Sequence, residues 1–578
     1  MAQTAARTAT ESKTRDAKGK PRRQESNRDL AEQIVVALIL AFLIRGFEAE
    51  AFVIPTGSMA PTLMGRHKEI TCKECGEVYS VNASDELDGR TSASRITSGT
   101  CGNCRYQADI RDAPSFKGDR ILVMKFLYSL PFLSGDEPER WDVVVFKYPE
   151  EPEVNYIKRL VGLPNEVLRV YFGDVLTRSI GSNEPFTIAR RPLEHQRAMQ
   201  MLVYDDRHRP KAFDGMADWQ RWKPREAKSW DEPTRGTFKP AAKSANWSNL
   251  RYRNLVPDPI QWKDVLAGRP TTKPRATLIS DYYSYNSNLS GERQNPMQDW
   301  FQPHWVGDLS LSCKVQAASP SGMLRFELVE GGISNRCEVD LATGKATLFH
   351  GRDPLGEPAQ TTLNDLKSHN VTFYNVDDRL TLEVDATAPF GDGLAYANPT
   401  DRHPAPTAAD LDPVGIAAKG ADVTVSDLVL KRDIYYTQNP GASDYAGIIP
   451  WVGGDDYDSR MVETFGLLSD PSRFADLGNL KERDFEIHPG HYMMMGDNSP
   501  RSKDGRQWDT TDQLRSDFPE YGWDPNRRES WEVPEALLIG KAFYVYWPHG
   551  KPFGPDIRFN QDFRVPFRPY IERMRWIR

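Results

Sequence analysis

The sequence predicts a mainly β fold carried by one N-terminal transmembrane helix. Three observations predict it: an apolar run close to the N-terminus, short alternating apolar runs divided by Gly, Asp and Pro, and two Cys-x-x-Cys pairs. A chain of 578 residues is too long for one domain, so two or three are expected. The net charge of -7 gives no indication of a nucleic-acid partner. We therefore predict a β-domain interrupted by a four-cysteine insertion and by a jelly-roll-like β-sandwich.

The N-terminal segment, residues 1–29, is polar, poor in aromatic side chains and richer in Lys and Arg than in Asp and Glu. Such a segment cannot bury enough apolar surface to form a core. We predict that it is a disordered basic tail.

An apolar run, Ile34–Ile44, follows this tail and ends at Arg45. Its eleven uncharged residues are fewer than the ~20 that span a bilayer. Extension to Leu30 and Val53 supplies the length but includes Glu32, Arg45, Glu48 and Glu50. Arg45 can snorkel to the interface, where the glutamates can also lie. We predict one transmembrane helix over residues 30–50. Because basic segments stay in the cytoplasm, we expect a single-pass protein of the cell membrane with the chain after residue 50 on the outer face.

Two other interpretations of this run stay open. Ala49-Glu50-Ala51 is an A-x-A pattern, which is typical of the cleavage site of a secretory signal peptide. The run is also short enough to be a buried helix of a soluble domain. The long polar segment before the run favours the membrane helix.

Four cysteines, Cys72, Cys75, Cys101 and Cys104, form two Cys-x-x-Cys pairs within residues 70–108. Two thiolate pairs at this spacing suit a tetrahedral zinc ion, and the pattern resembles a zinc ribbon. Four cysteine ligands leave no open coordination position, so we predict a structural and not a catalytic zinc. An oxidising compartment would favour disulfides, and that alternative stays open.

The middle of the chain has two parts. Residues 176–304 are rich in Trp, Pro, Arg and Asp with little periodicity, which predicts irregular connections packed on the main sheet. Residues 305–435 show repeated short strands, which indicate a β-sandwich. Within them, residues 371–385 loosely resemble a concanavalin-like or laminin-G-like jelly roll. Cys313 and Cys337 lie in strand-like segments and could be paired or separately buried.

Three acidic residues in or beside this run, Asp377, Asp378 and Asp385, could contribute to a cation site. The alternative is that they are ordinary turn and strand-edge acids. Such sandwiches often bind glycans or calcium, but a fold alone does not establish a function, and a spacer or protein-binding role is equally open. The basic and aromatic segment 558–578, which includes Trp576, either contacts lipid or covers the sheet.

Ser58 lies in the first of three polar motifs, Ile54-Pro55-Thr56-Gly57-Ser58-Met59-Ala60-Pro61-Thr62-Leu63, whose prolines predict a stiff loop. Lys158 lies in an apolar, strand-like run, residues 156–164, and a polar segment, Gly496–Arg506, comes much later. Taken singly, each motif fits an ordinary structure: a turn serine, an exposed strand lysine and an Asx-rich surface loop.

Together the three motifs hold the parts of a serine–lysine hydrolase. Serine is a poor nucleophile and needs a base within hydrogen-bonding reach. None of the motifs contains a histidine, whereas a lysine can serve once burial lowers its pKa and leaves it neutral. The apolar neighbours Ile157 and Leu160 favour such a shift at Lys158.

In this order, the three motifs resemble the conserved boxes of type I signal peptidase, the membrane-bound protease that removes signal peptides from exported proteins. The resemblance covers residues 30–70, 110–175 and 485–550. Four further segments resemble strands of that family: Gly118–Val123, Trp141–Phe146, Ile539–Ala542 and Tyr546–Pro548. The resemblance implies a catalytic domain in two parts, residues 51–175 and 436–578.

The resemblance also implies roles for the polar residues of the motifs. Ser58 would attack the scissile carbonyl, and Lys158 would take its proton and later donate one to the leaving amine. Ser502 would orient the lysine. The Ser58 backbone N–H and the Thr56 hydroxyl would stabilise the oxyanion.

Other residues would support the site by the same resemblance. Asp504 and Arg506 would hold the active-site loop as an ion pair, and Met59 would line a small apolar substrate pocket. The implied reaction is hydrolysis of one peptide bond after an A-x-A-like sequence, with no cofactor for catalysis. The implied partners are preprotein signal peptides, the lipid bilayer and the protein export machinery.

Two positions depart from the family's pattern. Gly505 stands where a serine is usual, and Trp141 stands where a glycine is usual. Neither position carries the chemistry, so an active enzyme is expected, but Gly505 could loosen the Asp504–Arg506 pair.

Two alternative functions are considered. A membrane-anchored binding protein on a catalytically decayed scaffold would use the β-sandwich insert, but the retention of Ser58, Lys158 and Ser502 argues against decay. A serine–lysine enzyme of the self-cleaving repressor type would carry a DNA-binding segment, for which the sequence gives no sign.

Overall fold

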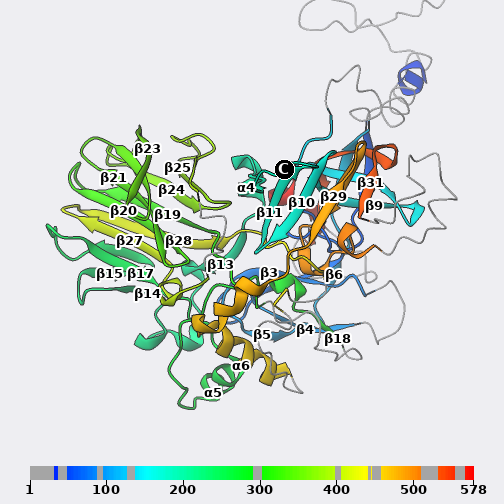
Figure 1. The fold of residues 1–578 in the computed structure, drawn as a ribbon. Helices are drawn as coiled ribbons and strands as arrows, with labels where there is room; N and C mark the ends of the chain where they lie inside the picture. The colour runs from blue at the N-terminus through cyan, green and yellow to red at the C-terminus, as the bar shows by residue number, and fades with distance from the viewer. Residues whose placement is uncertain are drawn as a thin grey trace, which may run out of the picture.

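The computed structural model describes residues 31–36, 49–86, 95–125, 137–290, 303–397, 405–440, 444–445, 457–508, 531–552 and 567–578. Over these ranges the chain is mainly β, as the sequence predicts. A pair of sheets with eight and seven strands lies on one side of the molecule, and another eight-stranded sheet lies on the other side with several smaller ones (Figure 1). The predicted basic tail, residues 1–29, lies outside the described residues.

The predicted transmembrane helix, residues 30–50, is described only in part. Residues 31–36 are helical, and residues 37–48 lie outside the described ranges. Among the described residues, no helix is both long and apolar enough to cross a bilayer. The prediction differs from the structure at its C-terminal end, because Ala49 and Glu50 are extended and pair with a neighbouring strand.

One antiparallel sheet joins the two ends of the chain, in the order β1-β7-β32-β8-β9-β30-β31 with β35 paired to β32. Its strands are β1 (Ala49–Val53), β7 (Arg120–Met124), β8 (Val143–Tyr148), β9 (Glu151–Gly162), β30 (His491–Met495), β31 (Glu532–Pro534), β32 (Leu538–Trp547) and β35 (Arg575–Trp576). Inward-facing Ile121, Val143 and Val545 bury one face of the sheet. Each polar motif adjoins this sheet, since one follows β1, one lies in β9 and one follows β30.

A four-stranded sheet packs beside the first one in the order β12-β11-β10-β29. Its strands are β10 (Glu166–Tyr171), β11 (Asp174–Ser179), β12 (Thr187–Ile188) and β29 (Asp484–Ile487). Leu168 of β10 shares an apolar cluster with Val161 of β9 and Met493 of β30. This packing holds β9, in which the second polar motif lies, and β30, which the third motif follows, against the four-stranded sheet.

The four-cysteine insertion consists of two hairpins. Strand β2 (His67–Thr71) pairs with β3 (Val78–Asn82), and β4 (Ile96–Thr100) pairs with β5 (Gln107–Asp109). Two short strands extend them: β6 (Ser115–Phe116) on β2 and β18 (Leu289–Ser290) on β4. Each Cys-x-x-Cys pair lies at the turn of one hairpin.

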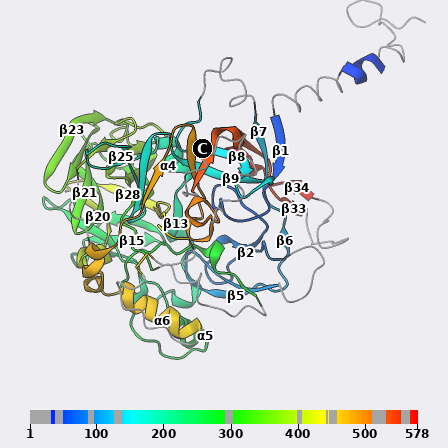
Figure 2. The ribbon, with the colours of Figure 1, turned by 45° about the vertical axis from the view of Figure 1, so that its right-hand side comes forward.

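Two large sheets share a single hydrophobic core to one side of these elements (Figures 1 and 2). Their orders are β15-β16-β28-β19-β24-β25-β26, with β13 paired to β28, and β14-β17-β27-β20-β21-β22-β23. The strands are β13 (Met201–Asp205), β14 (Trp222–Pro224), β15 (Trp230–Thr234), β16 (Thr237–Pro240), β17 (Ser248–Tyr252), β19 (Leu309–Ala317), β20 (Met323–Glu330), β21 (Ile333–Asp340), β22 (Lys345–His350), β23 (Asp353–Gln360), β24 (Ser368–Asn375), β25 (Arg379–Val384), β26 (Leu394–Ala395), β27 (Val414–Lys419) and β28 (Val423–Arg432). Cys313 and Cys337 are both buried in the shared core and form no disulfide.

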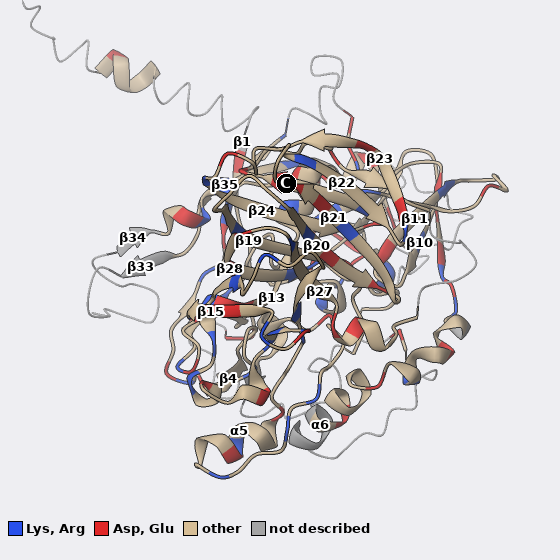
Figure 3. Cartoon of the chain, turned by 90° about the vertical axis from the view of Figure 1, so that its left-hand side faces the viewer, with Lys and Arg blue, Asp and Glu red and all other residues tan. Residues whose placement is uncertain are grey.

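Residues 176–304 differ from the irregular segment that the sequence predicts, because they supply β13–β17 to the two large sheets. These strands are short, and three of them contain proline, which removes a ladder hydrogen bond and hides the alternating pattern. Strand pairing fixes them instead, since β13 and β16 pair with β28, β17 pairs with β27, and β14 and β15 pair with β17 and β16. Basic and acidic residues are interspersed along the strands and are not separated by sign (Figure 3).

The described helices are few and short. They include α4 (Leu193–Ala198), α5 (Pro259–Leu266) and α6 (Tyr457–Leu468), and α5 and α6 lie next to each other (Figure 1). A capping box between Asp258 and Gln261 begins α5, whose Trp262 packs into the core of the cysteine hairpins. The 3-10 helices are η3 (Asp206–His208), η4 (Lys211–Phe213), η5 (Ala217–Trp219), η6 (Ser284–Asn286), η7 (Ala408–Leu411), η8 (Pro471–Asn479), η9 (Ser499–Arg501), η10 (Gly505–Gln507), η12 (Glu535–Leu537) and η13 (Ile571–Arg573), and a last ribbon pairs β33 (Gly550–Pro552) with β34 (Phe567–Pro569).

Candidate active site

The Ser58 loop is held by its apolar neighbours. Ile54, Met59 and Leu63 are buried in the core beneath β7 and β8, and the Leu63 N–H donates to the Met59 carbonyl at 2.8 Å. Ser58 itself is half-buried. The buried residues before and after Ser58 thus hold the loop in place, while Ser58 itself stays partly accessible.

Lys158 reaches the serine from β9. Its Nζ lies 2.6 Å from Ser58 Oγ, within a hydrogen bond, although the two residues are 100 positions apart. Lys158 is only 4% exposed, because β9 pairs with β8 and Lys158 stands opposite Val144. The two residues that the sequence predicts as nucleophile and base therefore meet directly.

The pKa of Lys158 is lowered to about 8. Burial is the main cause, and the Arg506 guanidinium lowers it further, whereas the carboxylates of Asp504 and Asp497 raise it. With this pKa, about one lysine side chain in ten is uncharged at pH 7, and the uncharged amine can accept a proton.

A buried ion pair that sequence reasoning missed lies behind the lysine. Arg159 Nε and Nη2 donate to the two carboxylate oxygens of Asp497, each at 2.7 Å, and both side chains are fully buried. Arg159 Nη1 also donates to the Trp141 carbonyl at 2.6 Å. The available signal was the position of Arg159 itself, since a charge within an apolar strand needs a partner.

The predicted Asp504–Arg506 pair is present and fully buried. Arg506 donates to both Asp504 oxygens, at 2.8 and 2.6 Å, and Asp504 accepts the Gly496 N–H at 3.0 Å. Burial raises the pKa of Asp504, but the charge and hydrogen bonds of Arg506 outweigh it and hold that pKa below its usual value. The pair thus ties the two ends of the third motif together.

Gly505 does not loosen this pair. A Cβ at this position would lie 2.5 Å from the Trp531 carbonyl oxygen, which is closer than any real contact. The close approach of this backbone explains the glycine.

Trp141 has a backbone conformation that normally belongs to glycine. Its φ is 79°, in the left-handed region, which costs an ordinary residue roughly 1–2 kcal/mol. The indole is 3% exposed and lies 5.4 Å from the Arg191 guanidinium carbon. Burial of this large side chain offsets the strain that a glycine would avoid.

The other predicted site residues lie near Ser58 without a direct contact to Lys158. Ser502 is buried beside Gly496. Thr56 is exposed, two residues before the serine. Met59 is 0% exposed, within the apolar core below the loop.

The four cysteines of the two hairpins come together. Cys72 Sγ and Cys104 Sγ are 3.6 Å apart, as are Cys75 Sγ and Cys101 Sγ, and all four sulfurs lie within 4.8 Å of one another. None of the four forms a disulfide. A tetrahedron with Zn–S bonds of about 2.3 Å has edges of roughly 3.8 Å, so this donor set fits a zinc ion.

A group of acids, of which Asp377 is buried and Asp174 and Asp308 are half-buried, lies where β11 approaches the start of β19. Carboxylate oxygens of Asp174, Asp308 and Asp377 lie within 4.8 Å of one another. Burial raises the pKa of the neighbouring Asp378 to about 6. Asp385, which the sequence groups with Asp377 and Asp378, instead pairs with His369 at 2.6 Å.

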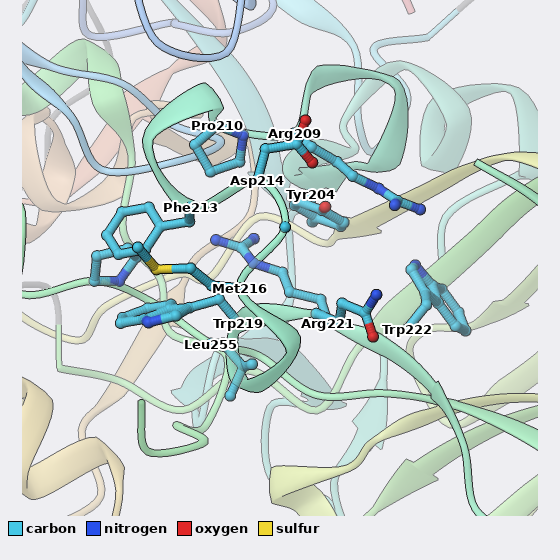
Figure 4. Close-up of a pocket in the computed structure, with 13 residues that line it drawn as sticks. Tyr204, Arg209, Pro210, Phe213, Asp214, Met216, Trp219, Arg221, Trp222 and Leu255 are labelled. Atoms are coloured by element: carbon cyan, nitrogen blue, oxygen red, sulfur yellow. The ribbon is translucent and has the colours of Figure 1, made fainter. Parts of the chain in front are cut away.

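A separate pocket is lined by residues of β13, of β14 and of the segment between them, together with Leu255 and Pro257 (Figure 4). The Arg221 guanidinium carbon lies 4.1 Å from the Tyr204 ring, and the rings of Phe213 and Trp219 pack with centroids 4.2 Å apart. No residue of the Ser58 site lines this pocket.

Comparison with known proteins bears on the Ser58 site. Residues 112–201 match the family described as signal peptidase, peptidase S26. Signal peptidase I of Pseudomonas fluorescens is 28% identical over 248 residues, which cover 40% of this chain and 64% of that relative. The chain is similar to signal peptidase I. The enzyme of Pseudomonas aeruginosa gives the same identity and coverage, and that of Rickettsia massiliae is 31% identical over 24% of this chain and 37% of the relative.

The chain therefore spans 64% of the length of the first of these relatives, and the similarity supports a peptidase. The matched segment 112–201 contains Lys158, whereas Ser58 and Gly496–Arg506 lie outside it. Among solved structures, a carbohydrate binding module from Bacillus subtilis aligns with 37% of this chain and 96% of its own, with 8% identity and a TM-score of 0.22, and a score this low supports no conclusion about function.

Proposed function

We propose that this protein is a signal peptidase I, a serine endopeptidase that uses Ser58 as nucleophile and Lys158 as general base. The observation that carries the proposal is the 2.6 Å contact between Ser58 Oγ and the Nζ of a buried lysine. The similarity to signal peptidases supports the same reaction.

In the proposed reaction, Ser58 Oγ attacks the carbonyl carbon of the scissile peptide bond, and Lys158 Nζ accepts the hydroxyl proton. The tetrahedral oxyanion is stabilised by the Ser58 N–H and the Thr56 hydroxyl. Lys158 then donates its proton to the leaving amine, and an ester remains on Ser58. Water, deprotonated by Lys158, hydrolyses this ester and restores the serine.

Three supporting roles complete the proposal. The buried Ser502 hydroxyl orients Lys158 when the substrate is bound. The Asp504–Arg506 pair holds the third motif against the Ser58 loop and sets the charge near the lysine. Met59 lines a small apolar substrate pocket. Because Met59 is buried, the proposal requires that a substrate side chain enters the apolar core below the loop.

The proposed substrates are preproteins, cut after an A-x-A-like sequence in an extended signal peptide. The protein would be a single-pass membrane protein with a cytoplasmic N-terminus and its catalytic domain on the outer face, in contact with lipid and the export machinery. The apolar run Ile34–Ile44 and the basic residues before it support this placement.

A structural zinc ion at the four cysteines is the last part of the proposal. Cys72, Cys75, Cys101 and Cys104 would hold it, and it would fix the turns of the two hairpins. It supplies no chemistry to the Ser58 site because all four coordination positions are filled.

The test is cleavage of a model preprotein with an A-x-A site, in detergent micelles, by wild type, Ser58→Ala and Lys158→Ala. We expect both variants to lose at least about 10⁴-fold in kcat. Cleavage that survives Ser58→Ala would mean a different nucleophile. A folded wild type that cleaves no preprotein would favour the binding-protein alternative.

A further inference from the structure

A segment of the insertion, residues 283–287, packs against the nucleophile loop. A Cβ on Gly57 would lie 2.2 Å from Tyr285 Cε1, so the ring occupies the space beside the glycine that precedes Ser58. Tyr285 is 0% exposed and Asn286 1% exposed. The segment belongs to the packed surroundings of the site and not to the molecular surface.

Asn286 forms a reciprocal amide pair with Asn498 of the third motif. Asn286 Nδ2 donates to Asn498 Oδ1 at 2.7 Å, and Asn498 Nδ2 donates to Asn286 Oδ1 at 2.8 Å. Both side chains are buried, so any other orientation leaves a polar group without a partner. Each amide therefore holds the other in one position.

Asn498 holds both peptide groups that flank the nucleophile. Its Nδ2 donates to the Gly57 carbonyl at 3.0 Å, and its backbone N–H donates to the Ser58 carbonyl at 3.0 Å. The Gly57 carbonyl and the Ser58 N–H belong to one planar peptide group. A hydrogen bond that fixes the carbonyl therefore also fixes the direction of the N–H.

We infer that Asn286 is a positioning residue that acts through Asn498 to aim the Ser58 N–H at the oxyanion. The inference rests on the proposed function and adds a residue that lies outside the three motifs of this chain that resemble the peptidase family. It gives the insertion a part in the chemistry, because Asn286 lies within residues 176–304, outside every segment that resembles the family.

This segment and the preceding Tyr282 connect the nucleophile loop to the cysteine hairpins. The Thr100 N–H donates to Ser287 Oγ at 2.8 Å, and the Tyr282 hydroxyl donates to the Thr100 carbonyl at 3.2 Å. Thr100 directly precedes Cys101. The hairpin that carries Cys101 and Cys104 therefore supports the segment.

The test compares Asn286→Ala and Asn498→Ala in the full chain, with the model preprotein as substrate. We expect Asn286→Ala to lower kcat about 10- to 100-fold with little change in KM, since loss of a whole oxyanion donor costs about 10²–10³. The pH midpoint of kcat/KM should not move, because the surroundings of Lys158 are unchanged. Ser284→Ala is the matched control, since Ser284 lies in the same turn but faces Gly102.

A double-mutant cycle makes the test sharper. Because both amides act on one peptide group, Asn286→Ala should slow the Asn498→Ala variant no further. Losses that multiply, or an unchanged kcat in Asn286→Ala, would overturn the inference. Asn286→Asp keeps the side-chain volume and should also lower kcat, because a carboxylate oxygen would then face Asn498 Oδ1, which is also an acceptor. If Asn286→Ala does not fold, Asn286→Asp takes its place in the test.

Hydrogen–deuterium exchange separates this inference from the proposed function. Exchange over residues 54–63 should be faster in Asn286→Ala than in wild type and unchanged in Ser284→Ala, whether or not a preprotein is cleaved. If exchange is faster in Asn286→Ala but wild type cleaves no preprotein, the proposed function is wrong, whereas the contact between Asn286 and Asn498 is supported. If wild type cleaves the preprotein and Asn286→Ala alters neither kcat nor exchange, the inference about Asn286 is wrong and the proposed function is unaffected.

Discussion

Burial of Lys158 predicts how the cleavage rate depends on pH. A pKa lowered from 10.5 to about 8 corresponds to about 3 kcal/mol against the charged form. At pH 7 about one Lys158 in ten is then neutral, against about one in 3,000 for an exposed lysine. We therefore expect kcat/KM to rise about tenfold per pH unit below pH 8 and to level off above it.

The assay is cleavage of the A-x-A preprotein in detergent from about pH 6 to pH 10, with thermal unfolding measured at each pH. Lys158→Arg is the control, since arginine keeps its charge at every pH and should cleave at none. A flat profile would mean that another group is the base. A rise only near pH 10.5 would mean that the lysine is exposed, and either result would refute the reasoning.

Three other predictions concern stability. Lys158→Met should raise Tm at pH 7 and increase the free energy of unfolding by up to about 3 kcal/mol, because burial of the charged lysine, which lowers its pKa in the folded state, destabilises the wild type. This gain should shrink as the pH rises from about 8 to 10.5, where the wild-type lysine loses its charge. Equal Tm values at pH 7 would contradict the prediction. Gly505→Ala should destabilise by about 1–3 kcal/mol because its Cβ meets the Trp531 carbonyl, whereas Gly466→Ala, in helix α6 with no atom within 4 Å, should stabilise by about 0.5–1 kcal/mol; thermal unfolding separates them, and equal shifts would refute the packing argument. The purified chain should hold one zinc ion by elemental analysis and lose Tm with a chelator; absence of zinc, with an intact mass lower by four hydrogens, would establish two disulfides instead.

The structure brings together several residues that compact motifs predict. Ser58 and Lys158 were predicted from their residue types, their neighbours and the resemblance of their motifs to a known family, and they lie 2.6 Å apart. The cysteine spacing predicted the four-sulfur cluster, because two Cys-x-x-Cys turns have only a few ways to face each other. In both cases the chemistry of a short segment limits its structure.

What sequence reasoning missed depends on contacts between distant segments. Nothing in the polar and aromatic run around Asn286 indicates that it would reach Asn498, 212 positions later. The strands β13–β17 are too short and too rich in proline to show a period, and only their partners make them strands. The glycine at position 505 is explained by a carbonyl 26 residues away and not by the pair beside it, to which the sequence alone had linked it.

The buried Arg159–Asp497 pair sets an order of events during synthesis. The two residues are 338 positions apart. A chain grows from its N-terminus at about 5–20 residues per second, so Asp497 follows Arg159 by roughly 20–70 s. An unpaired arginine cannot enter the apolar interior behind Lys158 at a tolerable cost before then. In the proposed peptidase, the surroundings of Ser58 and Lys158 would therefore be complete only after the whole insertion has been made, and the growing chain would not yet carry a finished active site.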